Sequence, residues 1–258
     1  MQDWSDITNL PDDFDGRVRL FPLPGLVLFP HAMQPLHVFE PRYCDMLQDA
    51  LSADHLIAMA TLAMPGDKPV PFELQGVSQP PIRPIICMGR IMSHTELEGD
   101  RHNILLVGTK RARVVSEIDV GRSFRMAEVD VLDDIYPVES ALTRNDLKSE
   151  LLEAFAAIIP PSANVQKNLH DLMAGQMGLG PITDIVSYTL PFDVDEKIAL
   201  LGEADVDRRA RLLITLLESG KIELHSISVE EQTGDVGKDS GGKRSGKGDR
   251  FPPPFSVN

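Results

Sequence analysis

The sequence predicts an α+β fold in which a β-rich part with one inserted helix comes first and a helical bundle follows. Between residues 17 and 136, short apolar and β-branched runs are separated by proline, glycine and acidic residues, a pattern that is typical of strands. After Pro137 the spacing of apolar residues changes from about two toward about 3.6, which is typical of amphipathic helices. The order of these patterns predicts an irregular barrel wall followed by packed helices.

The predicted strands fall into an early group that prolines interrupt and a later group of longer apolar runs. The early strands are expected over residues 18–20, 27–29 and 36–39, with Pro22, Pro24, Pro30 and Pro35 within or between them. Proline removes a hydrogen-bond donor, so these strands must be short, kinked or at a sheet edge. The later strands are predicted over residues 56–62, 85–92, 104–107, 111–118 and 124–132.

Two connections between strands are also predicted. The polar turn at residues 98–100 is expected to close a hairpin between the strands on either side of it. The segment 64–84 contains six prolines, namely Pro65, Pro69, Pro71, Pro80, Pro81 and Pro84. We expect this segment to form a long ordered loop.

The inserted helix is predicted to begin at Pro41, because a proline at the first helical position loses no intrahelical hydrogen bond. Its apolar stripe has helical spacing and consists of Tyr43, Met46, Leu47, Ala50 and Leu51. In the second half, Thr143 with Asp146, and Asp193 with Glu196, have the spacing of capping boxes. Helices are predicted there over residues 143–158, 163–177, 182–189, 194–201 and 205–220.

The same patterns divide the chain into four segments. We expect an N-terminal arm over residues 1–16, a β-barrel over 17–136, a helical bundle over 137–228 and a tail over 229–258. The tail is rich in Gly, Ser, Lys and Asp and contains little apolar surface to offset the entropy of ordering. It is therefore predicted to be disordered.

Composition and charge restrict the class of protein and its partners. The 258 residues are 42% hydrophobic and 25% charged, which is typical of soluble globular proteins. The net charge is −14, and because acids and bases balance in the tail, the negative excess lies on the folded part. An acidic surface opposes binding of a phosphate backbone, so we expect no nucleic-acid partner.

The sequence also indicates the cellular compartment and the state of the two cysteines. The start of the chain is acidic, and no apolar run approaches the roughly 20 residues of a membrane-spanning helix. We therefore expect a cytoplasmic protein without a membrane partner. Cys44 and Cys87 are expected to be reduced structural thiols, because neither belongs to a CxxC motif or a disulfide framework. The oligomeric state stays open.

No pattern for catalysis or for a cofactor emerges from the sequence. Two near-matches to a phosphate-binding loop begin at Gly237 and Gly241, but both lack the Ser or Thr after the Lys and the strand and helix that flank such a loop. No Gly-x-Ser-x-Gly elbow is present to activate a serine. We therefore expect no catalytic residue, no cofactor and no enzymatic activity.

Three polar residues near the predicted hairpin turn are candidate metal ligands. His94 and His102 flank the turn and could approach each other across the strands, with Glu96 as a third donor. None of the seven histidines has the i, i+4 spacing that places two imidazoles on one face of a helix. The favoured interpretation is that they are polar residues that assist the turn, so no metal site is predicted.

The most unusual local feature is the run from Phe39 to Tyr43 at the start of the inserted helix. The favoured interpretation is structural: Glu40 caps the helix or pairs with Arg42, while Tyr43 buries its ring and satisfies its hydroxyl. Direct contact of Arg42 and Tyr43 with a ligand is the alternative.

The residue types also indicate two candidate binding surfaces, one for a protein partner and one for a small anionic ligand. Phe72 and Leu74 lie in the proline-rich loop, and apolar side chains on a stiff loop lose little entropy when they bind a partner. They could instead fold over the end of the barrel. Arg113 together with Arg42 could hold a small anionic ligand in a pocket at the barrel end.

Several segments of the sequence resemble the Lon protease N-terminal domain family. The likeness spans roughly residues 17–220, and its most specific part is the opening string Leu-Phe-Pro-Leu-Pro-Gly-Leu-Val-Leu-Phe-Pro followed by Pro-Leu-His-Val-Phe-Glu-Pro-Arg-Tyr. These strings occupy residues 20–30 and 35–43. Weaker likeness is found at residues 88–91, 108–113, 182–185, 196–197 and 205–209.

The resemblance implies a PUA-like β pseudo-barrel followed by a helical bundle. In the family, this domain helps to capture protein substrates, while separate AAA+ and Ser-Lys protease domains carry out proteolysis. The chain ends before either of those domains could fit, so the resemblance implies a non-catalytic module that binds proteins or unfolded polypeptide segments, or an adaptor for ATP-dependent proteolysis. PUA-like folds also include RNA binders, but the net charge of −14 argues against that role here.

Overall fold

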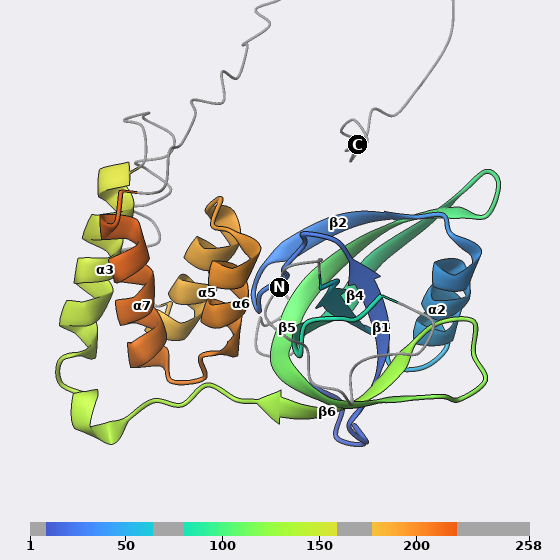
Figure 1. The fold of residues 1–258 in the computed structure, drawn as a ribbon, viewed down its shortest axis with the longest axis horizontal. Coiled ribbons are helices and arrows are strands. Elements are labelled where there is room, and N and C mark those ends of the chain that lie inside the picture. The colour runs from blue at the N-terminus through green and yellow to red at the C-terminus, as the bar shows by residue number, and fades with distance from the viewer. Residues whose placement is uncertain (1–8, 64–79, 159–176, 221–258) are drawn as a thin grey trace, which may run out of the picture. The chain divides into compact units, whose positions relative to one another are not determined.

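The computed structural model describes residues 9–63, 80–158 and 177–220. Its strands are β1 (Arg17–Leu23), β2 (Met33–Val38), β3 (Leu56–Thr61), β4 (Ile85–Leu97), β5 (Arg101–Ile118) and β6 (Met126–Leu132) (Figure 1). Its helices are α2 (Pro41–Leu51), α3 (Arg144–Ile158), α5 (Leu179–Thr189), α6 (Val194–Gly202) and α7 (Val206–Glu218), with a 3-10 turn at Val138–Ser140. The chain therefore has a mixed α+β fold in which strands and one helix precede the remaining helices.

The six strands form one sheet that closes on itself. The order is β2-β5-β4-β3-β1-β6, and β6 also pairs with β5, which closes the part that excludes β2. β1 and β3 run parallel, with Leu20 opposite Ala58, whereas the other pairs are antiparallel. A closed sheet leaves few unpaired strand edges that could join another chain.

Side chains alternate between two cores along the strands, as the period of two requires. Leu20 and Ala58 belong to one cluster, to which all five strands of the closed part contribute. Their neighbours Phe21 and Ile57 belong to a larger cluster that also contains the buried faces of α2, α3, α5, α6 and α7. α6 also packs against β4 and β5, so the helices and the closed sheet share one continuous apolar core.

Most predicted elements are confirmed, and the inserted helix is an example. α2 begins at Pro41, and it buries four residues of the predicted stripe and partly buries the fifth, Leu51. The side chain of Asp193 accepts a hydrogen bond from the backbone N–H of Glu196 at 2.7 Å, and Glu196 accepts one from Asp193 in return, so the second predicted capping box forms.

Two local predictions are wrong. Residues 27–29 are buried, but they form no strand. The strands expected over 104–107 and 111–118 are one continuous strand, β5, since Gly108 keeps its pairing with Gly89. The hydroxyl of Thr143 donates to the carbonyl of Ser140 at 3.3 Å, and the capping box of Thr143 with Asp146 stays a prediction. The predicted helix 163–177 and most of the loop 64–84 lie outside the described residues.

Among the strands that the structure describes, β2 pairs with β5 alone, and its open edge is largely blocked. The carbonyl of Ala32 faces β5, where it accepts from the N–H of Gly108, so alternation turns the backbone groups of Met33 and Pro35 outward. The hydroxyl of Tyr188 donates to the Met33 carbonyl at 3.1 Å, and the side-chain amide of Gln34 donates to the Pro35 carbonyl at 2.9 Å. Proline has no N–H, so this edge offers little to an added strand.

Candidate functional site

The chain crosses from the closed sheet to the helices through residues 133–143, which we call the linker. Its path is fixed by backbone hydrogen bonds to the segment that precedes α7. The N–H of Ile135 donates to the carbonyl of Ala204 at 2.9 Å, and the N–H of Val206 donates to the carbonyl of Ile135 at 3.0 Å. The linker is thus held against the helices at its start.

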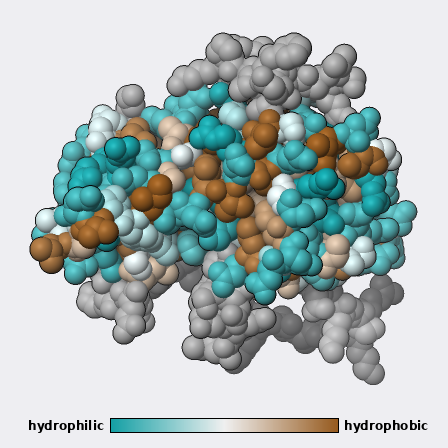
Figure 2. Space-filling view, turned by 90° about the horizontal axis from the view of Figure 1, so that it is seen from below, coloured by the Kyte–Doolittle hydropathy of each residue, from teal (hydrophilic) through white to brown (hydrophobic). Residues whose placement is uncertain are grey.

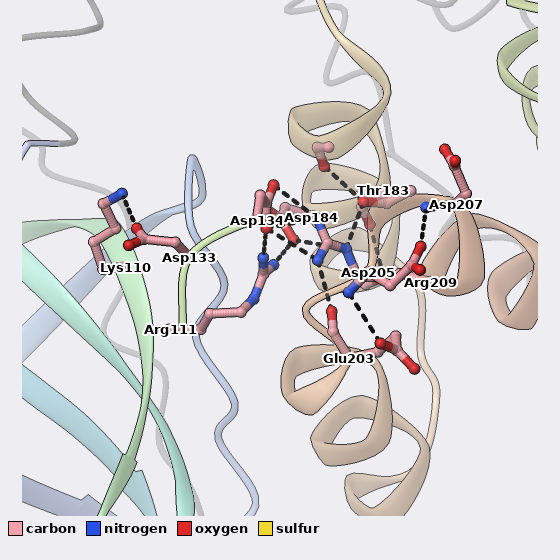
Figure 3. Close-up of polar contacts among 12 residues, drawn as sticks. Lys110, Arg111, Asp133, Asp134, Thr183, Asp184, Glu203, Asp205, Asp207 and Arg209 are labelled. Atoms are coloured by element: carbon pink, nitrogen blue, oxygen red, sulfur yellow. Dashed lines mark hydrogen bonds and ion pairs between the residues drawn. The ribbon is translucent and has the colours of Figure 1, made fainter. Parts of the chain in front are cut away.

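A buried ionic cluster lies beneath the start of the linker (Figure 3). Arg111 of β5 donates to Asp134 of the linker and to Asp184 of α5, and Arg209 of α7 donates to Asp134 at 3.0 Å. The side chains of Arg111, Asp184 and Arg209 are at most 2% exposed. The charges of the two cations and the two carboxylates balance. The cluster connects the sheet, the linker and two helices.

Arg209 uses its whole guanidinium in this cluster. Its Nε donates to the hydroxyl oxygen of Thr183 at 2.8 Å, and one Nη donates to the carbonyl of Glu203 at 2.7 Å. The planar fork of an arginine suits such a site, because five donors can be satisfied by acceptors from several elements. The cluster therefore depends on an arginine, rather than on a positive charge alone.

Burial raises the pKa of the Asp184 carboxyl to about 6, and the guanidinium groups of Arg111 and Arg209 oppose this rise. At a pH between the ordinary pKa of an aspartate and about 6, Asp184 is therefore protonated in the folded state but ionised in the unfolded state. Folding stability from this group is present at low pH and is lost as pH rises through about 6.

We expect the stabilisation that Asp184 contributes to fall by about 2 kcal/mol between about pH 4.5 and about pH 7. Urea unfolding of the protein and of the Asp184→Asn variant at several pH values measures this as the change in the difference between their unfolding free energies. The asparagine variant lacks the titrating carboxyl at every pH, so only the pH-dependent part of the difference is informative. A difference that stays constant with pH would contradict the assignment.

A second ion pair fixes the far end of the linker. Arg144, at the start of α3, donates to the buried carboxylate of Asp207 at 2.8 Å and to the carbonyl of Pro137 at 2.6 Å. Its guanidinium also lies 5.3 Å from the ring centroid of Tyr136. The hydrogen bond from Arg144 lowers the pKa of Asp207, since it favours the charged carboxylate.

The linker exposes apolar side chains between these two anchors. Leu142 is 95% exposed and Val138 is 84% exposed, and Ile135 and Tyr136 are about half exposed. Tyr136 and Met177 line a hollow of about 470 Å³, together with Arg144, Lys148 and Leu179. Figure 2 views the molecule from the side on which Figure 1 places the linker and shows apolar areas among hydrophilic ones. We call Ile135, Tyr136, Val138, Leu142 and Met177 the linker surface.

The structure places Arg42 and Tyr43 as the structural interpretation predicted. Tyr43 is 5% exposed, its ring centroid lies 4.6 Å from that of Phe21, and its hydroxyl donates to the carbonyl of Pro22 at 3.3 Å. Arg42 pairs with Glu40 at 2.8 Å and lies over the Tyr43 ring. Tyr43 is thus packed as part of the core, and a role for either residue in ligand contact stays a prediction.

The other predicted site residues do not gather at one place. Arg113 is exposed on β5, opposite Asp130 of β6, and no contact among the described residues joins it to Arg42. The anionic-ligand pocket therefore stays a prediction, with nothing in this geometry to favour it. Phe72 and Leu74 lie outside the described residues.

Sequence reasoning missed the linker surface. Ile135, Val138 and Leu142 stand at the boundary between the two predicted parts, where isolated apolar residues look the same whether they are buried or exposed. The signal that could have found them is their position, because the linker precedes the predicted start of a helix and lacks the period of either a strand or a helix. Their exposure depends on how the sheet and helices pack.

Within residues 9–63, 80–158 and 177–220, no group of three or more His, Cys, Asp or Glu side chains is placed to hold a metal ion. Among the helices that the structure describes, none is both long enough and apolar enough to span a membrane.

Comparison with known proteins identifies relatives along most of the chain. Residues 17–219 match the family model for the ATP-dependent protease La (LON) substrate-binding domain. A Lon protease of Dictyoglomus thermophilum is 23% identical over 230 residues, which are 87% of this chain and 27% of that protein. Lon protease 1 of Bacillus subtilis is 23% identical over 226 residues, also 27% of its length. The chain thus spans about a quarter of the length of these relatives.

Two solved structures share the fold. The N-terminal domain of a Mycobacterium avium complex Lon protease superposes with a TM-score of 0.57 at 13% identity, over 79% of this chain and 99% of that one. A Lon N-terminal domain protein from Xanthomonas campestris gives a TM-score of 0.52 at 22% identity, over 77% of this chain and 97% of that one. Each of these solved domains is covered almost completely.

Proposed function

The chain belongs to the family of Lon substrate-binding domains, and on this premise we propose that it is a non-catalytic module that binds proteins or unfolded polypeptide segments. It works in the cytoplasm, and its net charge of −14 favours polypeptide over nucleic acid as the partner. The PUA-like barrel and the helical bundle, with a boundary near residue 136, are the two parts of this module.

The observation that supports this proposal most is the linker surface. Single exposed apolar residues are ordinary on protein surfaces, but several in one short segment beside a hollow are characteristic of interaction sites. Val138 and Leu142 are almost fully exposed, so a partner could remove nearly all of their area from water. Burial of one such side chain stabilises a complex by about 1.5–3 kcal/mol.

The anchoring of the linker also favours binding. Ile135 is hydrogen-bonded to the segment before α7, and Arg144 ties Pro137 to Asp207, so the backbone on which the apolar side chains stand is already ordered. A surface that is ordered before binding loses little entropy when a partner arrives. Because the β2 edge is blocked at Met33 and Pro35, we propose recognition by side chains rather than by strand addition.

We expect the double substitution Val138→Ser, Leu142→Ser to weaken capture of unfolded polypeptide about tenfold or more, because two apolar anchors are lost. The measurement is fluorescence anisotropy of a labelled, permanently unfolded client titrated with the purified full chain. Both side chains are exposed, so the variant should unfold at the same urea concentration as the parent. Val120→Ser is the matched control, since Val120 is 47% exposed but lies outside the linker.

The same assay separates the linker from the proline-rich loop. If Phe72→Ala, Leu74→Ala weakens capture and the linker variant does not, the binding surface moves to the loop. Equal affinity of all variants and the parent would remove apolar capture from the proposal. We further propose that the module acts as an adaptor for ATP-dependent proteolysis, and loss of capture would remove this role too, because an adaptor must first hold its client.

A further inference from the structure

The hollow beside the linker surface is lined by cations, although the chain as a whole is acidic. Arg144 and Lys148 of α3 belong to its wall, and none of the described residues in that wall is acidic. The whole chain has 25 Lys and Arg against 39 Asp and Glu. Glu139 and Asp146 are close in sequence, but they are exposed and do not line the hollow, so water weakens their effect on it. The hollow is therefore a local exception to the charge of the chain.

Arg144 is a hydrogen-bond donor that the fold already holds in place. Its Nε and one Nη bind the carboxylate of Asp207 at 2.8 and 3.0 Å, and the same Nη donates to the carbonyl of Pro137 at 2.6 Å. The other Nη has no hydrogen-bond partner among the described residues. The Arg144 side chain is 19% exposed and lines the hollow, so a ligand can reach it. A guanidinium donates in several directions, so a ligand oxygen can bind here without breaking the pair with Asp207.

Other groups in the wall also favour a negative charge. Lys148 brings a second cation, and its Nζ donates to the carbonyl of Met177 at 2.9 Å, which places the ammonium group at the wall. α3 begins at Arg144 and α5 begins at Leu179, so the positive ends of two helix dipoles lie at this hollow. Gly178, the N-cap of α5, has no side chain to accept from the first N–H groups of that helix. An anion in the hollow would interact favourably with each of these groups.

The hollow also adjoins the apolar side chains of the linker surface. Tyr136 and Met177 belong to both, and the Arg144 guanidinium lies 5.3 Å from the centroid of the Tyr136 ring. Val138 follows Tyr136 by two residues and is 84% exposed. The volume of about 470 Å³ leaves room for a whole side chain rather than a small ion alone. The site therefore combines positive charge with apolar contact, which suits an acidic residue within an apolar stretch of polypeptide.

We propose that the hollow takes the carboxylate of an Asp or Glu that stands beside the apolar residues of a client polypeptide. This inference rests on the proposed function, because it names the clients that the linker surface prefers. The carboxylate accepts from the second Nη of Arg144 and lies near the charge of Lys148, while its apolar neighbours pack on the linker surface. Charge-assisted hydrogen bonds are about twice as strong as neutral ones, so the hollow discriminates among clients that are equally apolar.

Three labelled peptides test the proposal by fluorescence anisotropy with the purified full chain. They share their apolar residues and carry Glu, Gln or Lys at one position beside them. We expect the Glu peptide to bind about fivefold or more tightly than the Gln peptide, and the Lys peptide to bind most weakly. An acidic chain without a cationic site would give the opposite order, because a net charge of −14 attracts Lys and repels Glu.

A variant of the hollow locates the preference. Lys148→Gln should reduce the preference for Glu over Gln to about twofold or less and leave the affinity for the Gln peptide unchanged. The glutamine amide can still donate to the Met177 carbonyl, so the variant should remain folded. Lys110→Gln is the matched control, since it removes the same charge from a lysine that pairs with Asp133 at 2.7 Å and does not line the hollow.

The outcomes separate this inference from the proposed function. If the three peptides bind equally, or the Lys peptide binds best, the carboxylate site is wrong while apolar capture by the chain stands. Equal loss of preference in Lys110→Gln and Lys148→Gln would assign the effect to overall charge and overturn the site. Failure of the full chain to bind any of the three peptides would overturn both proposals.

Discussion

Arg209→Ala is expected to lower the free energy of unfolding by about 3–5 kcal/mol, because it leaves the carboxylates of Asp134 and Asp184 with Arg111 as their one remaining cation in the cluster. Arg209 is 0% exposed, pairs with Asp134 and also donates to Thr183 and Glu203, so its removal leaves three sets of acceptors unsatisfied. Alanine cannot fill the space, and water would have to enter between the sheet and the helices. A loss of this size is a large part of the stability of an ordinary domain.

Urea denaturation followed by circular dichroism measures this effect as a shift of the midpoint at constant slope. Arg208→Ala is the matched control, since the adjacent arginine is 73% exposed and makes only a 3.7 Å contact with Asp205. We expect the control to change stability by less than about 0.5 kcal/mol. If both substitutions shifted the midpoint equally, the buried cluster would not be what joins the two parts.

Gly108→Ala is expected to cost about 3 kcal/mol or more, or to prevent folding, because there is no room for a methyl group at this position. An added Cβ would lie 1.9 Å from the carbonyl oxygen of Phe29 and 2.7 Å from its carbon. Neither backbone can move aside easily, since Gly108 accepts from His31 and donates to Ala32, both at 2.9 Å. The clash therefore opposes the hydrogen bonds that attach the segment before β2 to β5.

The measurement is again the urea midpoint, with soluble yield recorded in case the variant does not fold. Gly178→Ala serves as control, because the nearest atom to its added Cβ is 3.9 Å away and its φ of −68° suits any residue. The control should change stability by less than about 1 kcal/mol, the range for an alanine at a helix N-cap. A Gly108→Ala protein as stable as the control would show that the segment before β2 can shift without loss.

The histidine pair and the linker surface differ in how far the sequence could predict them. The approach of His94 and His102 could be anticipated, because a short turn fixes which residues of a hairpin face each other. The exposure of Val138 and Leu142 could not, because it depends on which neighbours the finished packing supplies. Position along a strand is a local property, whereas exposure is not.

What the sequence by itself determined about this protein is its local structure and its family. The proline at position 41, the stripe from Tyr43 to Ala50 and the Asp193 cap each act within a few residues, so the interactions that form α2 and α6 are present in the sequence pattern itself.

Only the tertiary structure decided where the two parts meet. Arg111 and Asp184 are 73 residues apart, and Asp134 and Arg209 are 75 apart, and no periodicity links charges at such distances. It also decided that Gly108 stays within one long strand, because that depends on the pairing of Gly108 with Gly89 on β4. The physical reason is the same in both cases: these contacts exist only after the sheet has closed and the helices have packed on it.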